Sequence, residues 1–235
     1  MQELGWSDAL LYLLQAGALR ATRERLQLRK YYFVAQPIAS SPLLPAHRAA
    51  NISVRPARHG DAIVRDFPRP AAVIERRFAT GAECLVAYRE NQFVGFLWLQ
   101  SGAYVEDEVR CRFRPLPEES TVWDFDVHVE LRERGSFVFA RLWDEANRLL
   151  RSRGVRWSVS RISAFNAASL NAHIRLGAFP VGCAYFMVLG KWQLMIASGC
   201  PRLRVSLGRL SCPEIVMAAE RPKAYSRFRR LIRVA

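Results

Sequence analysis

Lysine is scarce in this sequence of 235 residues, although the chain is strongly basic. Lysine and arginine together number 35 against 21 acidic residues, a formal net charge of +14, and only Lys30, Lys191 and Lys223 are lysines. Nearly all of the positive charge is therefore arginine, which binds phosphate oxygens through two parallel hydrogen bonds. The basic surface suggests phosphate-bearing small molecules, anionic lipid or nucleic acid as partners, unless it reflects only a general bias toward arginine.

Cysteine is sparse as well, and its spacing shows no pattern. The five cysteines are odd in number, and no two of them form a C-x-x-C pair. This arrangement argues against a disulfide framework or a zinc site, and it predicts a reducing, cytoplasmic environment. The motifs G-x-S-x-G and G-x-G-x-x-G are both missing, which leaves serine hydrolase and Rossmann oxidoreductase chemistry without support.

An apolar run long enough to cross a membrane is missing too. Residues 176–201 hold a single charge, Lys191, but prolines and glycines divide them into two segments of strand length. The amino end carries Glu3 and Asp8 where a signal peptide would be positively charged. We therefore expect a cytoplasmic protein, either free or held peripherally on the inner face of the membrane.

The sequence does contain enough apolar residues for a substantial core, with 51% hydrophobic and 11% aromatic residues. Residues 7–29 predict an amphipathic helix with arginines toward its end, and a proline-containing linker follows. From residue 202 onward, nine arginines and lysines face two glutamates, so this tail holds half of the net charge. We divide the chain into an N-terminal helix and linker at 1–50, a central domain at 51–195 and a basic C-terminal extension at 196–235.

Hydrophobic periodicity in the central domain predicts a mixture of strands and helices. Residues 84–100 are typical of a β-hairpin that turns near Glu90 and Asn91. Apolar residues recur at helical spacing in 135–154, where Gly154 ends the helix. The other expected elements are strands within 51–61, 121–130, 155–163, 183–190 and 192–197, and a short helix at 166–177. Together they predict a mixed α/β fold with a twisted central sheet of roughly six or seven strands and helices on both faces.

The strand at 121–130 carries residues suited to chemistry. Alternation along a strand predicts four polar residues on one face and four apolar residues on the other. The polar residues are Asp124, Asp126, His128 and Glu130, and the apolar ones are Trp123, Phe125, Val127 and Val129. Three carboxylates and a histidine favour a solvent-filled cleft over an ordinary solvent-exposed sheet face. In such a cleft Asp126, Asp124 or His128 would accept a proton.

A basic, glycine-containing turn follows that strand and precedes a helix. It contains Arg132, Arg134 and Gly135 in the stretch LRERGSFVF. Such a turn exposes backbone N–H groups at the positive end of the helix dipole, and glycine permits a close approach to the backbone. The pattern predicts a binding site for phosphate or diphosphate.

The stretch FNAASLNAHIRLGA at residues 165–178 predicts a short helix with Asn166 as its N-cap and Gly177 at its end. It carries the polar residues Ser169 and His173 among apolar ones. Either these residues form a solvated face, with His173 as an ordinary surface or capping histidine, or one end of the helix holds a ligand and His173 faces the chemistry.

The order of these segments resembles the GCN5-related N-acyltransferases, the GNAT superfamily. Arg132 and Gly135 match that family's phosphate-binding signature, although Phe137 occupies the last position, where the family has glycine or alanine. In the later segment, Asn166, Ser169, His173 and Gly177 fall at the family's positions, with Ala178 in place of phenylalanine. The resemblance covers about residues 51–195, beginning at ISVRPARHGD.

This resemblance implies a mode of cofactor binding. Two parallel strands, 121–130 and 155–163, would separate, and the pantetheine arm of acyl-CoA or acetyl-CoA would pair with the freed backbone at Val127 and Val129. Asn166 and Ser169 would help to hold the pantetheine. The diphosphate would bind the turn, whose residues are Arg132, Arg134, Gly135, Ser136 and Phe137. No metal is expected.

The resemblance also implies a reaction, the transfer of an acyl group from acyl-CoA to a primary amine in a ternary complex. An alkylammonium has a pKa of about 10.4 and must lose a proton before it attacks, so Asp126, Asp124 or His128 would act as the base. A backbone N–H would stabilise the oxyanion. His173 stands where the family often has an acidic tyrosine and would protonate the departing thiolate.

The acceptor and the partners stay open. A basic amphipathic amino end, the aromatic residues Tyr31, Tyr32 and Phe33, and the tail YSRFRRLIRVA would suit an anionic membrane surface and a lipid amine as acceptor. Alternatively, both ends pack against the body or form a homodimer. A second class of function is a degenerate GNAT fold that serves as a basic nucleic-acid or protein-binding module, with nucleic acid the weaker prediction.

Overall fold

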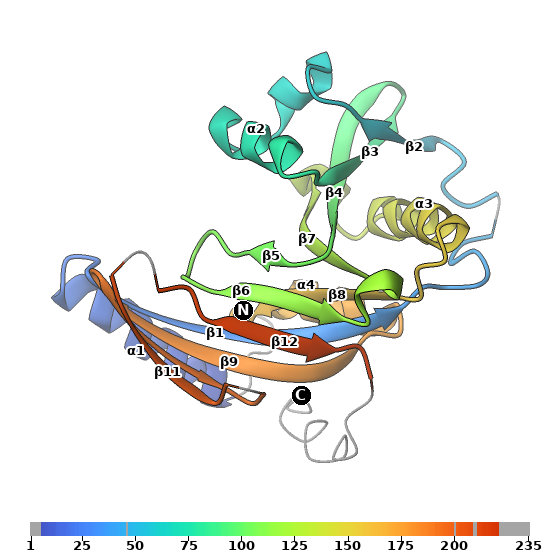
Figure 1. Ribbon diagram of the computed structural model, residues 1–235. Coiled ribbons are helices and arrows are strands. Elements are labelled where there is room, and N and C mark those ends of the chain that lie inside the picture. Colours follow the sequence, from blue (N-terminus) through green and yellow to red (C-terminus); the bar gives the residue numbers. More distant parts are fainter. Residues whose placement is uncertain (1–5, 46, 200, 209–210, 221–235) are drawn as a thin grey trace. The chain divides into compact units, whose positions relative to one another are not determined.

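The computed structural model describes residues 6–45, 47–199, 201–208 and 211–220 and shows a mixed α/β fold (Figure 1). The chain forms two compact units, and each has its own hydrophobic core. The first unit comprises the described residues within 1–37, 102–119 and 159–235, and the second comprises those within 38–101 and 120–158. The segment YSRFRRLIRVA at 225–235 and Cys200 lie outside the described residues.

The second unit is an antiparallel sheet with a helix on each face. Its strands lie in the order β2-β3-β4-β7. Their bounds are β2 (Ile52–Ala57), β3 (Glu83–Arg89), β4 (Gln92–Ser101) and β7 (Thr121–Val129). The helices are α2 (Ala71–Ala79) and α3 (Val138–Ser152), with short 3-10 turns at Ala62–Asp66 and Leu131–Glu133.

The hairpin expected at 84–100 is confirmed as β3 and β4. Glu90 and Asn91 link the two strands with φ of 50° and 64°, the left-handed conformation that a two-residue hairpin turn requires. The helix expected at 135–154 is confirmed as α3, and Gly154 follows its C-cap with a φ of 77°.

Apolar side chains from α2 and α3 hold the two faces of this sheet. Ile74 and Phe78 of α2 pack into a cluster with Val86, Phe96 and Trp98 of β3 and β4. The apolar stripe of α3 contacts β2, β3 and β4, and its fully buried members are Val138, Leu142, Trp143, Ala146 and Leu150. Burying one such large side chain contributes about 1.5–3 kcal/mol.

The first unit has a sheet with helices on one face and a small second sheet on the other. The main strands follow the order β11-β10-β9-β1, with β8 beside β1. Their bounds are β1 (Leu26–Pro37), β8 (Trp157–Ser163), β9 (Phe179–Leu189), β10 (Trp192–Ala197) and β11 (Leu203–Leu207). The small sheet consists of β5 (Tyr104–Val105), β6 (Arg112–Leu116) and β12 (Glu214–Ala218) in the order β12-β6-β5. A 3-10 turn at Glu118–Ser120 follows β6, and β8 crosses the unit boundary at residue 159.

Alternating side chains of β1 bind the layers of this unit together. Tyr32 and Val34 pack with Leu170 of α4 (Ala167–Arg175) on one face. On the other face, the ring of Phe33 lies 5.2 Å from the ring of Phe113 in β6. The sheet is therefore covered by a helix on one side and by strands on the other.

A buried polar cluster attaches α1 (Trp6–Ala21) to β1. Asp8 accepts hydrogen bonds from Lys30 Nζ at 2.5 Å and from Tyr32 Oη at 2.7 Å. The side chains of Lys30 and Asp8 are only 6% and 8% exposed. Because both donors lie on the same face of β1, one aspartate in the first turn of α1 fixes the helix against the strand.

The expected helix at 7–29 is wrong in its second half. An N-terminal helix is present, but it ends at Ala21, where Arg23 and Glu24 adopt left-handed φ values of 51° and 65°. The chain then enters β1. The aromatic residues at 31–33, which one of the two alternatives placed on a membrane surface, are 1–3% exposed, so for them that alternative is wrong.

The remaining differences concern the number of strands. The described residues contain strands numbered up to β12, more than the six or seven expected, because β1, β5, β6, β11 and β12 were not predicted. The interpretation of residues 176–201 as strands is confirmed by β9 and β10. None of the helices within the described residues is both long and apolar enough to cross a bilayer.

Candidate functional site

The central feature of the second unit is a bulge in β7. The pairing of β7 with β4 shifts register there, so that Asp126 and Val127 together lie opposite Leu97. Asp126 adopts a φ of 49°, the left-handed region that suits glycine. Such strain persists where the surroundings enforce it, and it clusters at functional sites.

The bulge overturns the expected polar face of this strand. Cross-strand partners share a face, and Asp124 pairs with Leu99 whereas His128 pairs with Phe96. Because positions 96 and 99 of β4 point to opposite faces, Asp124 and His128 do as well. Asp124 is 1% exposed and accepts a hydrogen bond from Ser158 Oγ at 2.5 Å. The prediction of a single face that carries both residues is therefore wrong.

Two arginines bind Asp126: Arg69, which precedes α2, and Arg77, which lies in α2. Its Oδ2 accepts a hydrogen bond from Arg69 Nε at 2.8 Å, and Arg77 forms a second ion pair. The Arg77 guanidinium also lies over the rings of Trp98 and Phe125, at 5.3 and 5.1 Å. Burial raises the pKa of Asp126, but the hydrogen bond from Arg69 and the charge of Arg77 outweigh it and hold the pKa below its ordinary value. An ionised carboxylate with occupied lone pairs is a weak proton acceptor.

His128 has the geometry of an oriented base. Its Nε2 lies 3.1 Å from Oε1 of Glu130, and because a carboxylate accepts, Nε2 donates and Nδ1 is left to take up a proton. The ring is parallel to that of Phe93, at an interplanar angle of 3°, and it also contacts Phe96. The side chain is 19% exposed and so stays accessible to a small substrate.

The turn between β7 and α3 presents open backbone amides. Gly135 has a φ of 84°, and the space beside its Cα is open. Within the described part of the chain, the N–H groups of Gly135 and Phe137 have no hydrogen-bond partner. Phe137 is the N-cap of α3, and its side chain accepts no hydrogen bond from the helix. The positive end of α3 is therefore free to bind an anion.

The charges around this turn are mostly unpaired and positive. Arg132 and Arg134 are exposed, whereas the single carboxylate of the turn, Glu133, is paired with Arg89 at 3.0 Å. The hydrogen bond from Arg89 lowers the pKa of Glu133 and keeps it ionised. The ring of Phe137, 42% exposed, lies 5.8 Å from the guanidinium of Arg48. The bulky residue that departs from the family pattern thus contributes a ring that faces another arginine.

The predicted residues of the first unit lie on α4. Asn166 is confirmed as the N-cap, and its Oδ1 accepts a hydrogen bond from Ser169 N at 3.0 Å. His173 is 2% exposed, and its Nδ1 lies 3.3 Å from Oε1 of Gln36. Gly177 follows the C-cap with a φ of 90°. Binding by Asn166 and Ser169 and proton donation by His173 stay predictions.

The structure therefore brings the predicted residues together in two separate sets. One runs along β7 and the following turn of the second unit, and the other lies on α4 of the first unit. Sequence reasoning missed Arg69, Arg77 and Arg89, which pair with carboxylates of the first set. A proline at position 70 and apolar residues at 74 and 78 signalled a helix that would have placed Arg77 beside a strand.

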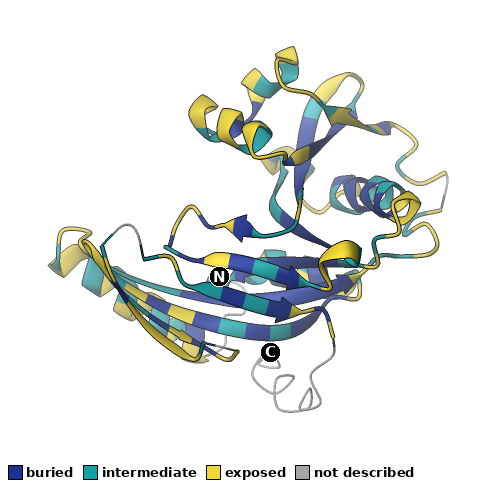
Figure 2. Cartoon of the chain, viewed as in Figure 1, coloured by how far each residue is buried: buried dark blue, intermediate teal, exposed yellow. Residues whose placement is uncertain are grey.

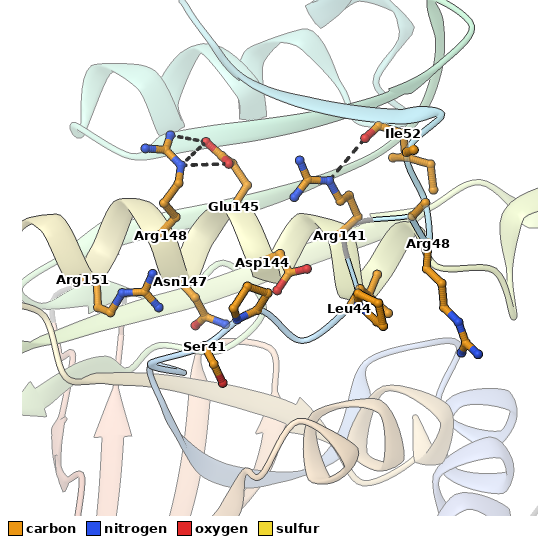
Figure 3. A pocket seen from close by; sticks show the side chains of 14 residues that line it. Ser41, Leu44, Arg48, Ile52, Arg141, Asp144, Glu145, Asn147, Arg148 and Arg151 are labelled. Atoms are coloured by element: carbon orange, nitrogen blue, oxygen red, sulfur yellow. Dashed lines mark hydrogen bonds and ion pairs between the residues drawn. The ribbon is translucent and has the colours of Figure 1, made fainter.

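A cavity of about 550 Å³ lies elsewhere in the second unit, along α3 (Figure 3). Figure 3 shows its walls, which are α3 and the segment that precedes β2. Among its charged side chains, Arg148 pairs with Glu145, whereas Arg141 and Arg151 donate to the backbone carbonyls of Ile52 and Ala39. None of the predicted site residues lines it.

Comparisons with known proteins give no family assignment. No protein-family model and no curated protein matches the chain. The structure is similar to a conserved protein of unknown function from Staphylococcus epidermidis, at 13% identity and a TM-score of 0.48, over 74% of this chain and 67% of that one. It is also similar to a GCN5-related N-acetyltransferase from Sphaerobacter thermophilus, at 20% identity and a TM-score of 0.43, over 73% of this chain and 55% of that one.

A third similar structure is YncA from Salmonella typhimurium with its cofactor acetyl-CoA, at 18% identity and a TM-score of 0.38, over 67% of this chain and 92% of that one. The match to the Sphaerobacter protein spans little more than half of that protein's length. Likenesses at such TM-scores carry no argument about activity.

Proposed function

We propose that the protein is an acyl-CoA-dependent N-acyltransferase that transfers an acetyl or longer acyl group to a primary amine. One observation carries the proposal: a strained bulge at Asp126 in β7 is followed by a turn whose amides at Gly135 and Phe137 are unpaired at the start of α3. A bulge leaves the backbone of its extra residue outside the ladder, which an extended ligand can use, and the turn suits a diphosphate. The motif resemblance to the GNAT superfamily supports the same assignment.

The donor is proposed to bind along the second unit's segment from β7 to α3. Val127 and Val129 offer main-chain groups to the pantetheine, and the turn receives the diphosphate. The residues of the turn in this role are Arg132, Arg134, Gly135, Ser136 and Phe137. Arginines and backbone N–H groups together recognise phosphate through charge and geometry.

The proposed base is His128, with Asp126 and Asp124 as weaker candidates. His128 has a free Nδ1 and is oriented by Glu130, whereas Asp126 is occupied by two arginines and Asp124 is buried. The amine nitrogen loses its proton to His128, directly or through a water, and attacks the thioester carbon. The C–S bond then breaks, and the CoA thiolate takes up a proton, for which His173 is the proposed donor.

Binding measurements test the donor assignment. Native mass spectrometry or calorimetry with acetyl-CoA and long-chain acyl-CoAs should show binding, and the relative affinities report the acyl length. Arg132→Ala should weaken acetyl-CoA binding and leave S-acetylpantetheine, which lacks the diphosphate, unaffected. Arg58→Ala, an exposed arginine of the same unit, is the matched control. Absence of acyl-CoA binding together with salt-sensitive RNA binding would instead identify a nucleic-acid module.

Kinetics test the roles of the two histidines. His128→Gln should lower kcat far more than it raises KM for acyl-CoA. His173→Phe should lower kcat if the residue protonates the thiolate. Unchanged turnover across pH in the latter variant removes that role while leaving the donor assignment intact.

The acceptor is proposed to be a primary amine, and a lipid amine is one candidate class because a basic chain suits an anionic membrane surface. Incubation of the protein with acetyl-CoA and a panel of soluble and lipid amines, followed by mass analysis of products, identifies it. Acylation of soluble amines alone would remove the lipid version.

A further inference from the structure

The outward face of β9, β10 and β11 in the first unit is apolar where a sheet normally meets water with polar residues. Trp192 of β10 pairs with Leu189 on one side and Leu207 on the other. These three side chains are 53%, 49% and 59% exposed. Figure 2 shows exposed positions recurring along these strands. We call the outward side chains within 185–189, 192–196 and 203–207 the apolar face.

The row at the other end of the apolar face repeats this pattern. Ile196 pairs with Tyr185 and Leu203, which are 48%, 41% and 61% exposed. Between the two rows, Val205 is 58% exposed. The opposite side of β9 and β10 is buried at Phe186 and Met195, so these two strands carry apolar residues on both sides, whereas Arg204 of β11, which pairs with Met195, is exposed. A half-exposed antiparallel sheet ordinarily alternates apolar and polar residues, so the apolar face lacks its cover.

Helix α1 extends this surface. Lys30 of β1 binds Asp8 of α1, and its ammonium lies 5.2 Å from the centre of the ring of Tyr185, so helix and apolar face share one side of the sheet. The outward stripe of α1 contains Leu10, Leu13 and Leu14, which are 59%, 66% and 55% exposed.

The rim of the apolar face is positively charged. Arg25 precedes Leu26, which pairs with Leu189, and Lys191 precedes Trp192, so both cations stand at one end of the rows. Arg202 stands at the other end, next to Leu203. These three cations are exposed, and none forms an ion pair with any described residue. Glu24 is the one carboxylate in the stretch from 20 to 25, which also holds three arginines.

We propose that the apolar face and the leucines of α1 dock on an anionic lipid bilayer. The apolar rows enter the boundary between headgroups and acyl chains, Trp192 and Tyr185 lie at headgroup level, and the cations of the rim contact lipid phosphates. The inference goes beyond the proposed acyl transfer and does not depend on it.

The charge of the rim favours a bilayer over a second copy of the chain. In a two-fold symmetric dimer built on this face, rim cations would meet rim cations, and the chain carries a net charge of +14. An anionic bilayer supplies the opposite charge and an apolar interior together, so it satisfies both features of the surface.

Vesicle flotation of the full chain tests the proposal. Binding is expected to vesicles of phosphatidylcholine mixed with phosphatidylglycerol, to be much weaker to phosphatidylcholine alone, and to decrease as salt rises. Val205→Glu should abolish binding. Its matched control is Val105→Glu on β5, which is 57% exposed against 58% for Val205 and should bind as the parent does.

A charge series provides the second comparison. Replacing Arg25, Lys191 and Arg202 by glutamine should weaken binding about fivefold for each residue. The control with the same loss of charge replaces Arg58, Arg65 and Arg175, all exposed and without an ion pair to any described residue, and should weaken binding far less.

Three results would overturn the proposal. One is equal vesicle binding by Val205→Glu and Val105→Glu with circular dichroism unchanged. The second is binding that does not depend on the anionic lipid. The third is a dimer of the parent chain in light scattering that becomes a monomer in Val205→Glu, together with no binding of the parent chain to vesicles. That result would assign the apolar face to a second copy.

Discussion

Two aspartates, one in each unit, are each held by two cationic or polar donors, but in different backbones. Asp8 lies in the first turn of a regular helix and accepts from Lys30 and Tyr32, and the Asp8 and Lys30 side chains are almost fully buried. Asp126 lies in a bulge with a left-handed φ, and its donors Arg69 and Arg77 stay partly exposed. The same local chemistry therefore serves two purposes.

The difference teaches how to separate an anchor from a functional cluster. The Asp8 cluster joins a helix to a strand without strain, so its role is stability. Asp126 has a strained backbone, and two arginines bind its carboxylate close to His128. Backbone strain together with clustered charges is characteristic of a functional site. The following predictions test this contrast.

The largest effect is expected from Asp8→Asn. The change leaves the Lys30 ammonium buried without a counter-charge, and breaking such a pair costs about 3–5 kcal/mol. Urea unfolding followed by circular dichroism measures it. Asp66→Asn, at an exposed position, should change the stability by less than about 0.5 kcal/mol. Near-identical values for the two variants would remove the anchoring role.

Alkaline pH should weaken the same cluster. Burial raises the pKa of Tyr32 to about 12, and hydrogen bonds with Asp8 and Tyr32 outweigh burial and raise the pKa of Lys30. A free tyrosine has a pKa of about 10, so above that pH the unfolded chain binds fewer protons and stability falls as pH rises toward 12. Tyr32→Phe should reduce this slope, whereas Tyr12→Phe, 50% exposed, should leave it unchanged.

A smaller loss of stability is expected from Asp126→Asn, about 1–3 kcal/mol, because its arginines keep some contact with water. Asparagine tolerates a left-handed φ, so the loss reports the charge and not the backbone. The pKa of Asp126 is lowered in the fold, so its stabilisation is present above about pH 4 and is lost as pH falls below that. Comparing unfolding of the variant and the parent at pH 3 and pH 7 checks the sign: the gap should close at the lower pH.

The smallest effects concern the two helix starts. Asn166→Ala removes the cap of α4 and should cost about 1 kcal/mol. Phe137→Asp supplies the cap that α3 lacks and should stabilise the chain by about 0.5–1 kcal/mol. The added carboxylate would place a negative charge beside the open amides of Gly135 and Phe137, so acetyl-CoA binding should weaken. Tighter binding by this variant would contradict the assignment of the turn.

Sequence patterns predicted the local elements whose signals are self-contained. The hairpin at 84–100 combines strand alternation with a turn pair, Glu90 and Asn91, that tolerates left-handed φ values. Helix α4 has its N-cap and its glycine at the right spacing. These features depend on neighbours within a few residues, and a linear pattern contains them.

Features that depend on distant residues were missed. A strict period of two assigned Asp124 and His128 to one face, because the bulge between them is fixed by pairing with β4 and by two arginines that precede it by about fifty residues. The leucines and arginines of 7–29 continue a helical pattern past Ala21, yet pairing with β9 draws residues 26–37 into a strand. Tertiary pairing outweighed local propensity in both cases.

The division of the first unit into three chain segments sets an order of assembly during synthesis. Residues 38–101 and 120–158, which complete the second unit, are synthesised before residues 159–235. Leu26 pairs with Leu189, so β1 is synthesised long before its partner strand β9. Until then its apolar residues Tyr31, Phe33 and Val34 have no strand to pack with. For a nascent chain this is a long period of exposure, in which a chaperone has the most to protect.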